Sequence, residues 1–93
     1  MTRSADLAAY EASLRPLRLR ELEAEAERVL LGAARSWGRL KDGYTDRAVE
    51  CLRELKRRHL AGLWPLIVGR VRERRAREQG IGLPLPWEGK ADG

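Results

Sequence analysis

The sequence predicts an all-α protein, a small helical bundle built on an antiparallel helical hairpin. Apolar residues recur at three- and four-residue steps through most of the chain, which is the period of an α-helix. Leu, Ala, Glu and Arg are abundant, and all four are strong helix formers. The 93 residues suit one domain, which we place at residues 1–81, followed by an extended tail over residues 82–93.

A short N-terminal helix is expected between Ser4 and Pro16. Ser4 is a suitable N-cap, because its hydroxyl can accept a hydrogen bond from a free amide of the first turn. Leu7, Tyr10 and Leu14 then recur at helical spacing. Pro16 lacks an amide hydrogen and disfavours helix at the preceding residue, so it ends or kinks this helix.

The first helix of the hairpin is predicted over about Leu17–Lys41. Gly32 and Gly38 are weak points, each costing about 1 kcal/mol relative to Ala. The dipeptide Asp42-Gly43 is interpreted as the stop signal. The expected apolar face consists of Leu19, Leu22, Ala26, Val29, Ala33, Trp37 and Leu40.

The second helix of the hairpin is predicted over about Asp46–Leu63, with Thr45 as its start signal. The connection is short, so this helix should run antiparallel to the first. His59 falls on the apolar side and is interpreted as a half-buried residue with a partner. The expected inner face consists of Ala48, Val49, Leu52, Leu55, His59 and Leu63.

A basic C-terminal helix is predicted over about Leu66–Gln79. Pro65 suits the first position of a helix, where its missing amide hydrogen costs nothing. Gly80 suits the C-cap. Beyond it, residues 83–87 alternate leucine and proline before a tryptophan, a composition that favours an extended polyproline II segment.

Positive charge is concentrated in one part of the chain. The net charge is +5, and residues 53–77 alone carry nine basic against two acidic residues, or +7, so the remainder sums to −2. The chain has 16 Arg and three Lys. Arginine binds phosphate and carboxylate through two parallel hydrogen bonds, although a high-GC genome also enriches it.

This cluster leads us to expect a non-enzymatic, nucleic-acid-binding accessory protein that is a subunit of a larger nucleoprotein complex. An arginine-rich helix suits phosphate contacts, which give affinity for DNA or RNA with little sequence specificity. The simpler alternative is a solvated helix end whose cations complement the helix dipole. The predicted nucleic-acid-binding residues are Arg57, Arg58, Arg70, Arg72, Arg74, Arg75 and Arg77.

The alternative function is a protein–protein interaction or adaptor module, either a helical homodimer or a subunit that docks on a larger machine. Polyproline II segments lose little entropy when they bind, so the tail suits a groove on a partner. It also suits the apolar face of this chain's own bundle. The predicted partner-binding residues are Trp64, Leu83, Leu85 and Trp87.

Catalysis, a cofactor and a metal site are not expected. Cys51 and His59 are the only residues of their types and, on one helix, would lie about 12 Å apart, too far for a nucleophile and its base. No set of ligands has metal-binding spacing. The polar N-terminus, the lone cysteine and the shortness of the uncharged run at residues 60–69 lead us to expect a cytoplasmic protein without a membrane span. An interfacial membrane anchor at residues 60–71 is disfavoured by Pro65.

Overall fold

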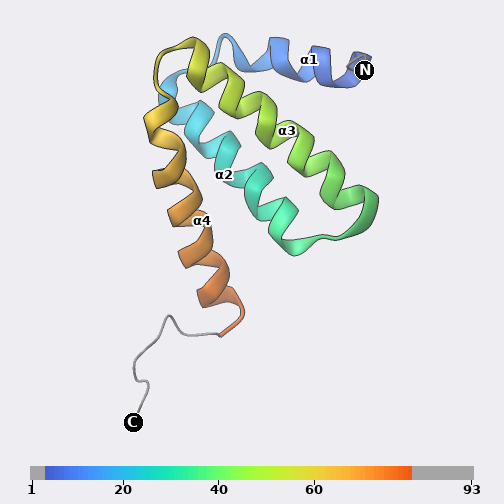
Figure 1. Ribbon diagram of the computed structural model, residues 1–93, viewed down its shortest axis with the longest axis vertical. Coiled ribbons are helices and arrows are strands. Elements are labelled where there is room, and N and C mark those ends of the chain that lie inside the picture. Colours follow the sequence, from blue (N-terminus) through green and yellow to red (C-terminus); the bar gives the residue numbers. More distant parts are fainter. Residues whose placement is uncertain (1–3, 81–93) are drawn as a thin grey trace.

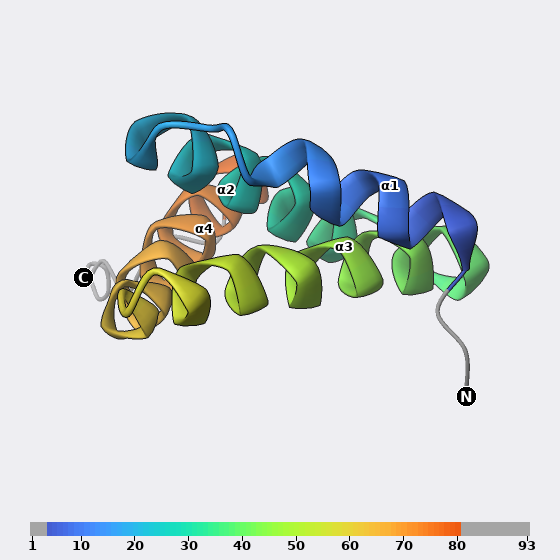
Figure 2. The same ribbon diagram turned by 90° about the horizontal axis from the view of Figure 1, so that it is seen from above.

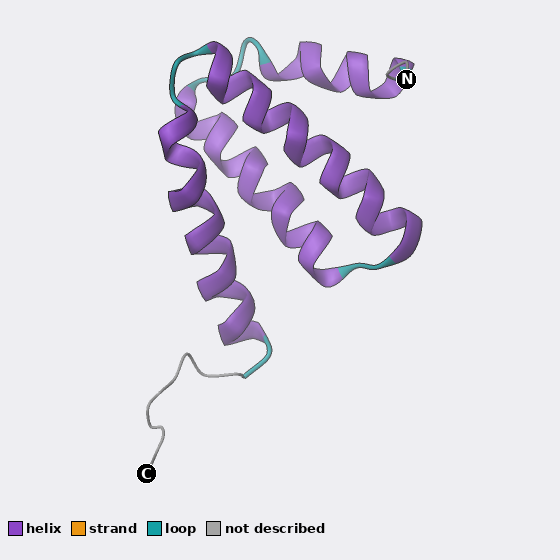
Figure 3. Ribbon diagram, in the orientation of Figure 1, coloured by secondary structure: helices purple, strands orange, loops and turns teal. Residues whose placement is uncertain are grey.

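The computed structural model describes residues 4–80, and every regular element among them is helical (Figures 1 and 3). This confirms the predicted all-α fold. The predicted partner-binding residues of the tail lie outside the described residues. The elements are α1 (Ala5–Leu14), α2 (Leu19–Arg35), α3 (Gly38–Arg57), the short 3₁₀ helix η1 (Ala61–Leu63) and α4 (Trp64–Glu78).

The helix α2 lies between α3 and α4 and contacts both (Figure 1). The helices α2 and α3 run antiparallel, as the predicted hairpin requires. The turn that contains η1 reverses the chain again, so α4 runs in the same direction as α2. The helix α1 packs along α3 (Figure 2). The C-terminal ends of α2 and α4 therefore lie at the same end of the bundle.

The core is small and lies where α1, α2, α3 and the start of α4 meet. Its volume comes from leucines and smaller residues, since the chain has no phenylalanine. Tyr10, Tyr44 and Trp64 pack against its edge. The buried core residues are Leu14, Leu22, Ala26, Val29, Ala48, Cys51, Leu55 and Ile67.

The predicted ends of the hairpin helices are wrong at the turn, and α3 also ends earlier than predicted, at Arg57 instead of about Leu63. The helix α2 ends at Arg35, and the chain reverses through Ser36 and Trp37, which are both extended, into Gly38 at φ +63°. That φ is favourable only for glycine, so Gly38 forms the turn instead of weakening a helix. The predicted stop at residues 42–43 and start at residues 45–46 lie inside α3, where the Thr45 hydroxyl donates to the Lys41 carbonyl oxygen.

This shift in the turn exposes residues that the sequence placed inside. Trp37 is 84% exposed and Leu40 is 62% exposed. Val49 on α3 is also exposed. The prediction for His59 is wrong as well, because this residue is exposed at φ 61°, just beyond the end of α3. A residue in this left-handed conformation commonly follows the end of a helix, and that residue is usually glycine or asparagine.

Gly32 of α2 lies against the side chain of Tyr44 of α3. A Cβ atom added to Gly32 would lie 2.5 Å from Cε1 of Tyr44. The Tyr44 ring therefore rests on the backbone of α2, and only glycine leaves room for it. From the sequence alone, Gly32 is expected to be a weak point of the helix. In the structure it is instead needed for the packing of α3 on α2.

The predicted ends of the outer helices are confirmed. The amide of Leu7 donates to the Ser4 hydroxyl oxygen at 3.1 Å, so Ser4 caps α1. The helix α1 ends two residues before Pro16. Pro65 stands in the first turn of α4, and Gly80 follows that helix at φ +67°.

Candidate nucleic-acid interface

Arg57 and Arg58, at the end of α3, are bound to Glu54, whose side chain is fully buried. Arg57 donates two hydrogen bonds to this carboxylate, at 2.7 and 3.1 Å. Arg58 donates one at 2.7 Å, and its other end donates to the carbonyl oxygens of Leu14 and Arg15, both at 3.1 Å. Arg58 thus joins α3 to the end of α1, which is a structural task.

The Glu54 carboxylate is charged because of these two arginines. Burial raises the pKa of Glu54, but the hydrogen bonds from Arg57 and Arg58 outweigh burial and hold this pKa below its usual range. A buried carboxylate with two guanidinium partners has its hydrogen-bonding capacity used within the chain. The predicted site residues Arg57 and Arg58 are therefore largely occupied by Glu54.

Arg70 links α4 to α2. Its Nε donates to Glu27 and its Nη2 donates to Glu23, each at 2.9 Å. Glu23 and Glu27 are one turn apart on α2, so one guanidinium spans both carboxylates. These hydrogen bonds raise the pKa of Arg70 further above its ordinary value. The Arg70 side chain is still half exposed, although both of its carboxylate partners, Glu23 and Glu27, lie on α2.

Glu78 is shared by three arginines at the end of α4. Arg35 of α2 donates two hydrogen bonds to it, one of them at 3.0 Å from Nε. Arg74 and Arg75 lie farther from the same carboxylate, at 3.7 and 3.8 Å. The hydrogen bonds from Arg35 lower the pKa of Glu78, with smaller contributions from the other two cations. One carboxylate cannot neutralise three guanidinium groups, so this end of the bundle keeps excess positive charge.

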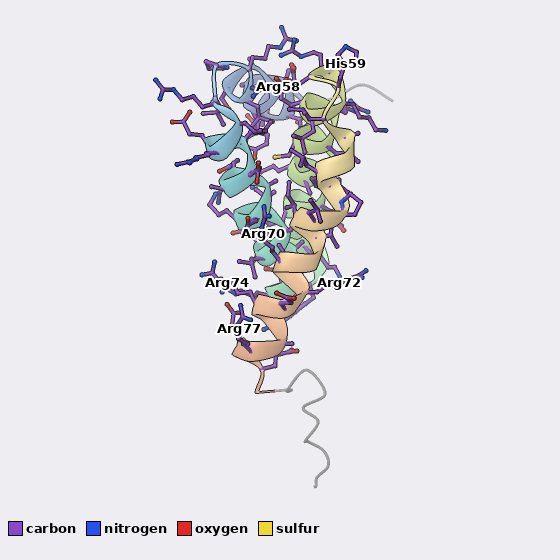
Figure 4. The ribbon with its side chains drawn as sticks, turned by 90° about the vertical axis from the view of Figure 1, so that its left-hand side faces the viewer. Arg58, His59, Arg70, Arg72, Arg74 and Arg77 are labelled. Atoms are coloured by element: carbon purple, nitrogen blue, oxygen red, sulfur yellow. The ribbon has the colours of Figure 1, made fainter. Side chains whose placement is uncertain are left out.

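Arg72 and Arg77 are exposed and form no ion pair within residues 4–80. Figure 4 shows Arg70, Arg74 and Arg77 along one side of α4 and Arg72 on the other. We call Arg70, Arg74 and Arg77 the arginine stripe of α4. The structure brings five of the predicted residues together on α4 and leaves Arg57 and Arg58 at the far end of the bundle.

A groove of about 560 Å³ runs between α2 and α4 beside this stripe. Its charged lining holds five arginines against two glutamates, a surplus of +3. The arginines of α2 are not among the site residues predicted from the sequence. Arg28 and Arg35 are seven residues apart and share a face of α2. The sequence does not indicate that α4 packs beside that face. The arginines lining the groove are Arg20, Arg28, Arg35, Arg70 and Arg74.

A second polar cluster lies between α1, α2 and α3. The Tyr10 hydroxyl donates to Glu25 at 2.5 Å and lies 3.5 Å from the Cys51 sulfur. Arg28 also binds Glu25, at 2.6 and 2.9 Å. Burial raises the pKa of the Cys51 thiol and that of the Tyr10 hydroxyl, so both groups stay protonated at neutral pH. This cluster fixes α1 against the hairpin and presents no nucleophile.

The remaining predicted site residue, Trp64, opens α4 and is partly buried against the core. Among residues 4–80, no three His, Cys, Asp or Glu side chains converge in a way that suits a metal ion. None of the described helices combines the length and the apolar composition that a bilayer span requires. No family model, curated protein or solved structure matches the chain.

Proposed function

We propose that the protein binds the phosphate backbone of nucleic acid through the second half of α4, as an accessory without catalytic activity of its own. The observation that carries this proposal is the charge balance of that helix. Five arginines between residues 70 and 77 face two glutamates on α4. Of these five, Arg72 and Arg77 have no carboxylate partner within residues 4–80.

The groove between α2 and α4 supports the same proposal, because it extends the basic surface onto a second helix. Arg74 lines this groove together with Arg35 of α2. Their shared carboxylate, Glu78, is partly exposed, and ion pairs at exposed positions are screened by solvent and contribute little, so a phosphate can displace it. Release of counterions from the nucleic acid then supplies the binding free energy.

The surface suits backbone contact better than base stacking. No aromatic residue lies between Arg70 and Arg77. Binding of single strands normally uses aromatic side chains on which the bases stack. Phosphate contacts position a protein without reading sequence, so we expect low sequence specificity.

The test is a salt titration of binding to fluorescently labelled duplex DNA and RNA, measured by anisotropy. The variant is Arg72→Gln/Arg77→Gln, which removes two exposed charges that have no ion pair within residues 4–80. Each lost phosphate contact lowers the slope of log K against log salt concentration by about 0.9, so we expect a slope smaller by roughly two.

The matched control is Arg39→Gln/Lys41→Gln, which removes the same charge from exposed positions of α3. If binding depends only on net charge, both variants weaken it equally, and the assignment to α4 is wrong. If the native chain shows no binding at low salt, the function itself is wrong.

The adaptor function stays a prediction. Three of its four residues, Leu83, Leu85 and Trp87, lie outside the described residues. Trp64 is partly buried, and its packing against the core explains its apolar character without a partner.

A further inference from the structure

The turn between α2 and α3 carries an exposed apolar patch, which we define as Trp37 and Leu40. These are the two most exposed of the large apolar side chains in residues 4–80, at 84% and 62%. They line a hollow of about 320 Å³ together with Arg35 and Ser36. Single exposed leucines are common, but a tryptophan beside a leucine over a hollow is a surface that favours burial.

The end of α4 lies beside the end of α2, and the patch begins two residues after that end of α2. The ion pair between Arg35 and Glu78 holds the last residues of α2 and α4 together, and Trp37 follows Arg35 by two residues. The chain leaves α4 at Gly80 and continues for another 13 residues, 81–93. The described chain therefore ends, at Gly80, at the same end of the bundle as the patch.

The sequence of this segment matches the patch in reach. Leu83 follows Glu78 by five residues, which in a polyproline II conformation spans about 16 Å at roughly 3.1 Å per residue. The patch occupies only the turn and the first turn of α3, a length of about one helical pitch, roughly 5 Å. Leu83, Leu85 and Trp87 can thus all reach it while α4 stays intact.

The charges match as well. The first turn of α3 contains no acidic residue. It carries Arg39 instead, with Lys41 following, at the end of the helix where the backbone dipole is positive. Trp37, the N-cap, offers no side-chain hydrogen bond to the free amides. Glu88 and Asp92 follow the apolar part of the segment and, with Lys90 between them, give it a net side-chain charge of −1, opposite in sign to Arg39 and Lys41.

From this placement we propose that residues 81–93 fold back on their own chain and pack Leu83, Leu85 and Trp87 over Trp37 and Leu40. The segment would close the end of the bundle where α2 and α4 finish. This inference does not depend on nucleic-acid binding, because none of the arginines used in that proposal is needed for the apolar contact.

The test places a nitroxide on the segment and observes the tryptophan indoles by NMR. In the full chain, Gly89→Cys receives the label, while the buried native Cys51 does not react. The tail in contact with the patch should broaden the Trp37 indole signal beyond detection. The Trp64 signal should persist, because Trp64 stands at the opposite end of a helix about 22 Å long.

Two variants make the result specific. Leu40→Ser should restore the Trp37 signal, whereas Leu66→Ser, which alters a leucine of similar exposure on α4, should leave it broadened. Both residues are exposed, so both variants should fold, and the amide spectrum checks this. A Trp37 signal that persists in the labelled native chain overturns the proposal.

A mixed sample separates the possible occupants of the patch. It contains ¹⁵N chains without nitroxide and unlabelled chains with nitroxide. Loss of the Trp37 signal in this mixture shows that the segment of a second copy covers the patch, and the intramolecular contact is then wrong. Retention in the mixture together with loss in the single-species sample supports it.

Discussion

The α2–α3 hairpin and the second half of α4 are held in place by different forces. In the hairpin, apolar side chains interlock around Leu22, Val29 and Leu55, and the Tyr44 ring rests on the backbone of Gly32. On α4, Val71 is the last buried residue. The ion pairs that join this half of α4 to α2 are those of Arg70, just before Val71, and of Glu78, at the end of the helix.

This difference explains why arginine has different roles in the two regions. The arginines near the hairpin end, Arg57 and Arg58, meet a buried carboxylate and stabilise the fold. Those after Val71 outnumber their carboxylates and lie in solvent, where ion pairs contribute little. Whether an arginine stabilises the fold or is free to bind a ligand therefore depends on whether a buried carboxylate lies beside it, and not on the number of arginines in the region.

The largest expected effect is on the hairpin side. Glu54→Ala removes the buried partner of Arg57 and Arg58 and should lower the free energy of unfolding by about 2–3 kcal/mol, since it leaves partly buried cations without a carboxylate. Glu73→Ala, which removes an exposed carboxylate from α4, is the control and should change it by less than about 0.5 kcal/mol. Urea denaturation measures both effects. Equal effects would contradict the claim that the buried carboxylate stabilises the fold more than an exposed one.

The same carboxylate gives a pH dependence. The pKa of Glu54 is lower in the folded chain than the ordinary value of 4.5. Its contribution to stability is therefore complete above that value and is lost as the pH falls through the folded pKa. When the pH is lowered below about 4.5, the urea concentration at the unfolding midpoint of the native chain should decrease. The decrease over the same pH range should be smaller for Glu54→Gln. Parallel curves for the two proteins would contradict this.

A smaller effect is expected from Gly32→Ala. The new Cβ has no space beside Tyr44, and overpacking of this kind costs about 1–3 kcal/mol. The matched control is Gly43→Ala on α3, where nothing lies within 4 Å of the added atom. That change should stabilise the protein by about 0.5–1 kcal/mol through helix propensity. Thermal unfolding of the two variants should shift in opposite directions.

Arg70→Gln should act on α4 alone. Loss of the contacts to Glu23 and Glu27 should speed hydrogen exchange at amides 72–78 and leave the hairpin amides unchanged. Added salt should speed exchange at the same amides in the native chain, because it screens exposed ion pairs. A uniform increase over the whole chain would show that α4 and the hairpin open as one unit.

The smallest effect on stability is expected from Arg72→Gln/Arg77→Gln. Neither residue has an ion pair within residues 4–80, so the unfolding midpoint should stay within experimental error of the native one. This matters for the binding test, because a loss of affinity is then not a loss of fold. A marked fall in the midpoint would mean that these arginines belong with the structural group.

Most of the fold follows from local sequence signals, and the exception has a physical cause. Ser4, Pro16, Pro65 and Gly80 act within one turn of their own positions, so their effects are readable from the sequence. The hairpin turn is not, because Asp42-Gly43 and Ser36-Trp37-Gly38 are both suitable reversals. The packing of Tyr44 on Gly32 accompanies the second, and that contact joins residues 12 apart.

The candidate site was predictable only as a count of charges. The sequence showed that five arginines fall between residues 70 and 77. It did not show that Arg35 and Arg74 would face one another across a groove. Nor did it show that Glu54 would be buried, since a glutamate between basic residues looks like ordinary helix surface. Both facts depend on which helices become neighbours.

The contact between Gly32 and Tyr44 also has a consequence for sequence variation. A side chain at position 32 and a ring at position 44 occupy the same space, so the two positions should vary together. A chain with this hairpin and an alanine at position 32 should carry a smaller residue at position 44. Positions 32 and 44 thus form a paired signature by which distant versions of this hairpin can be recognised even where the arginines have changed.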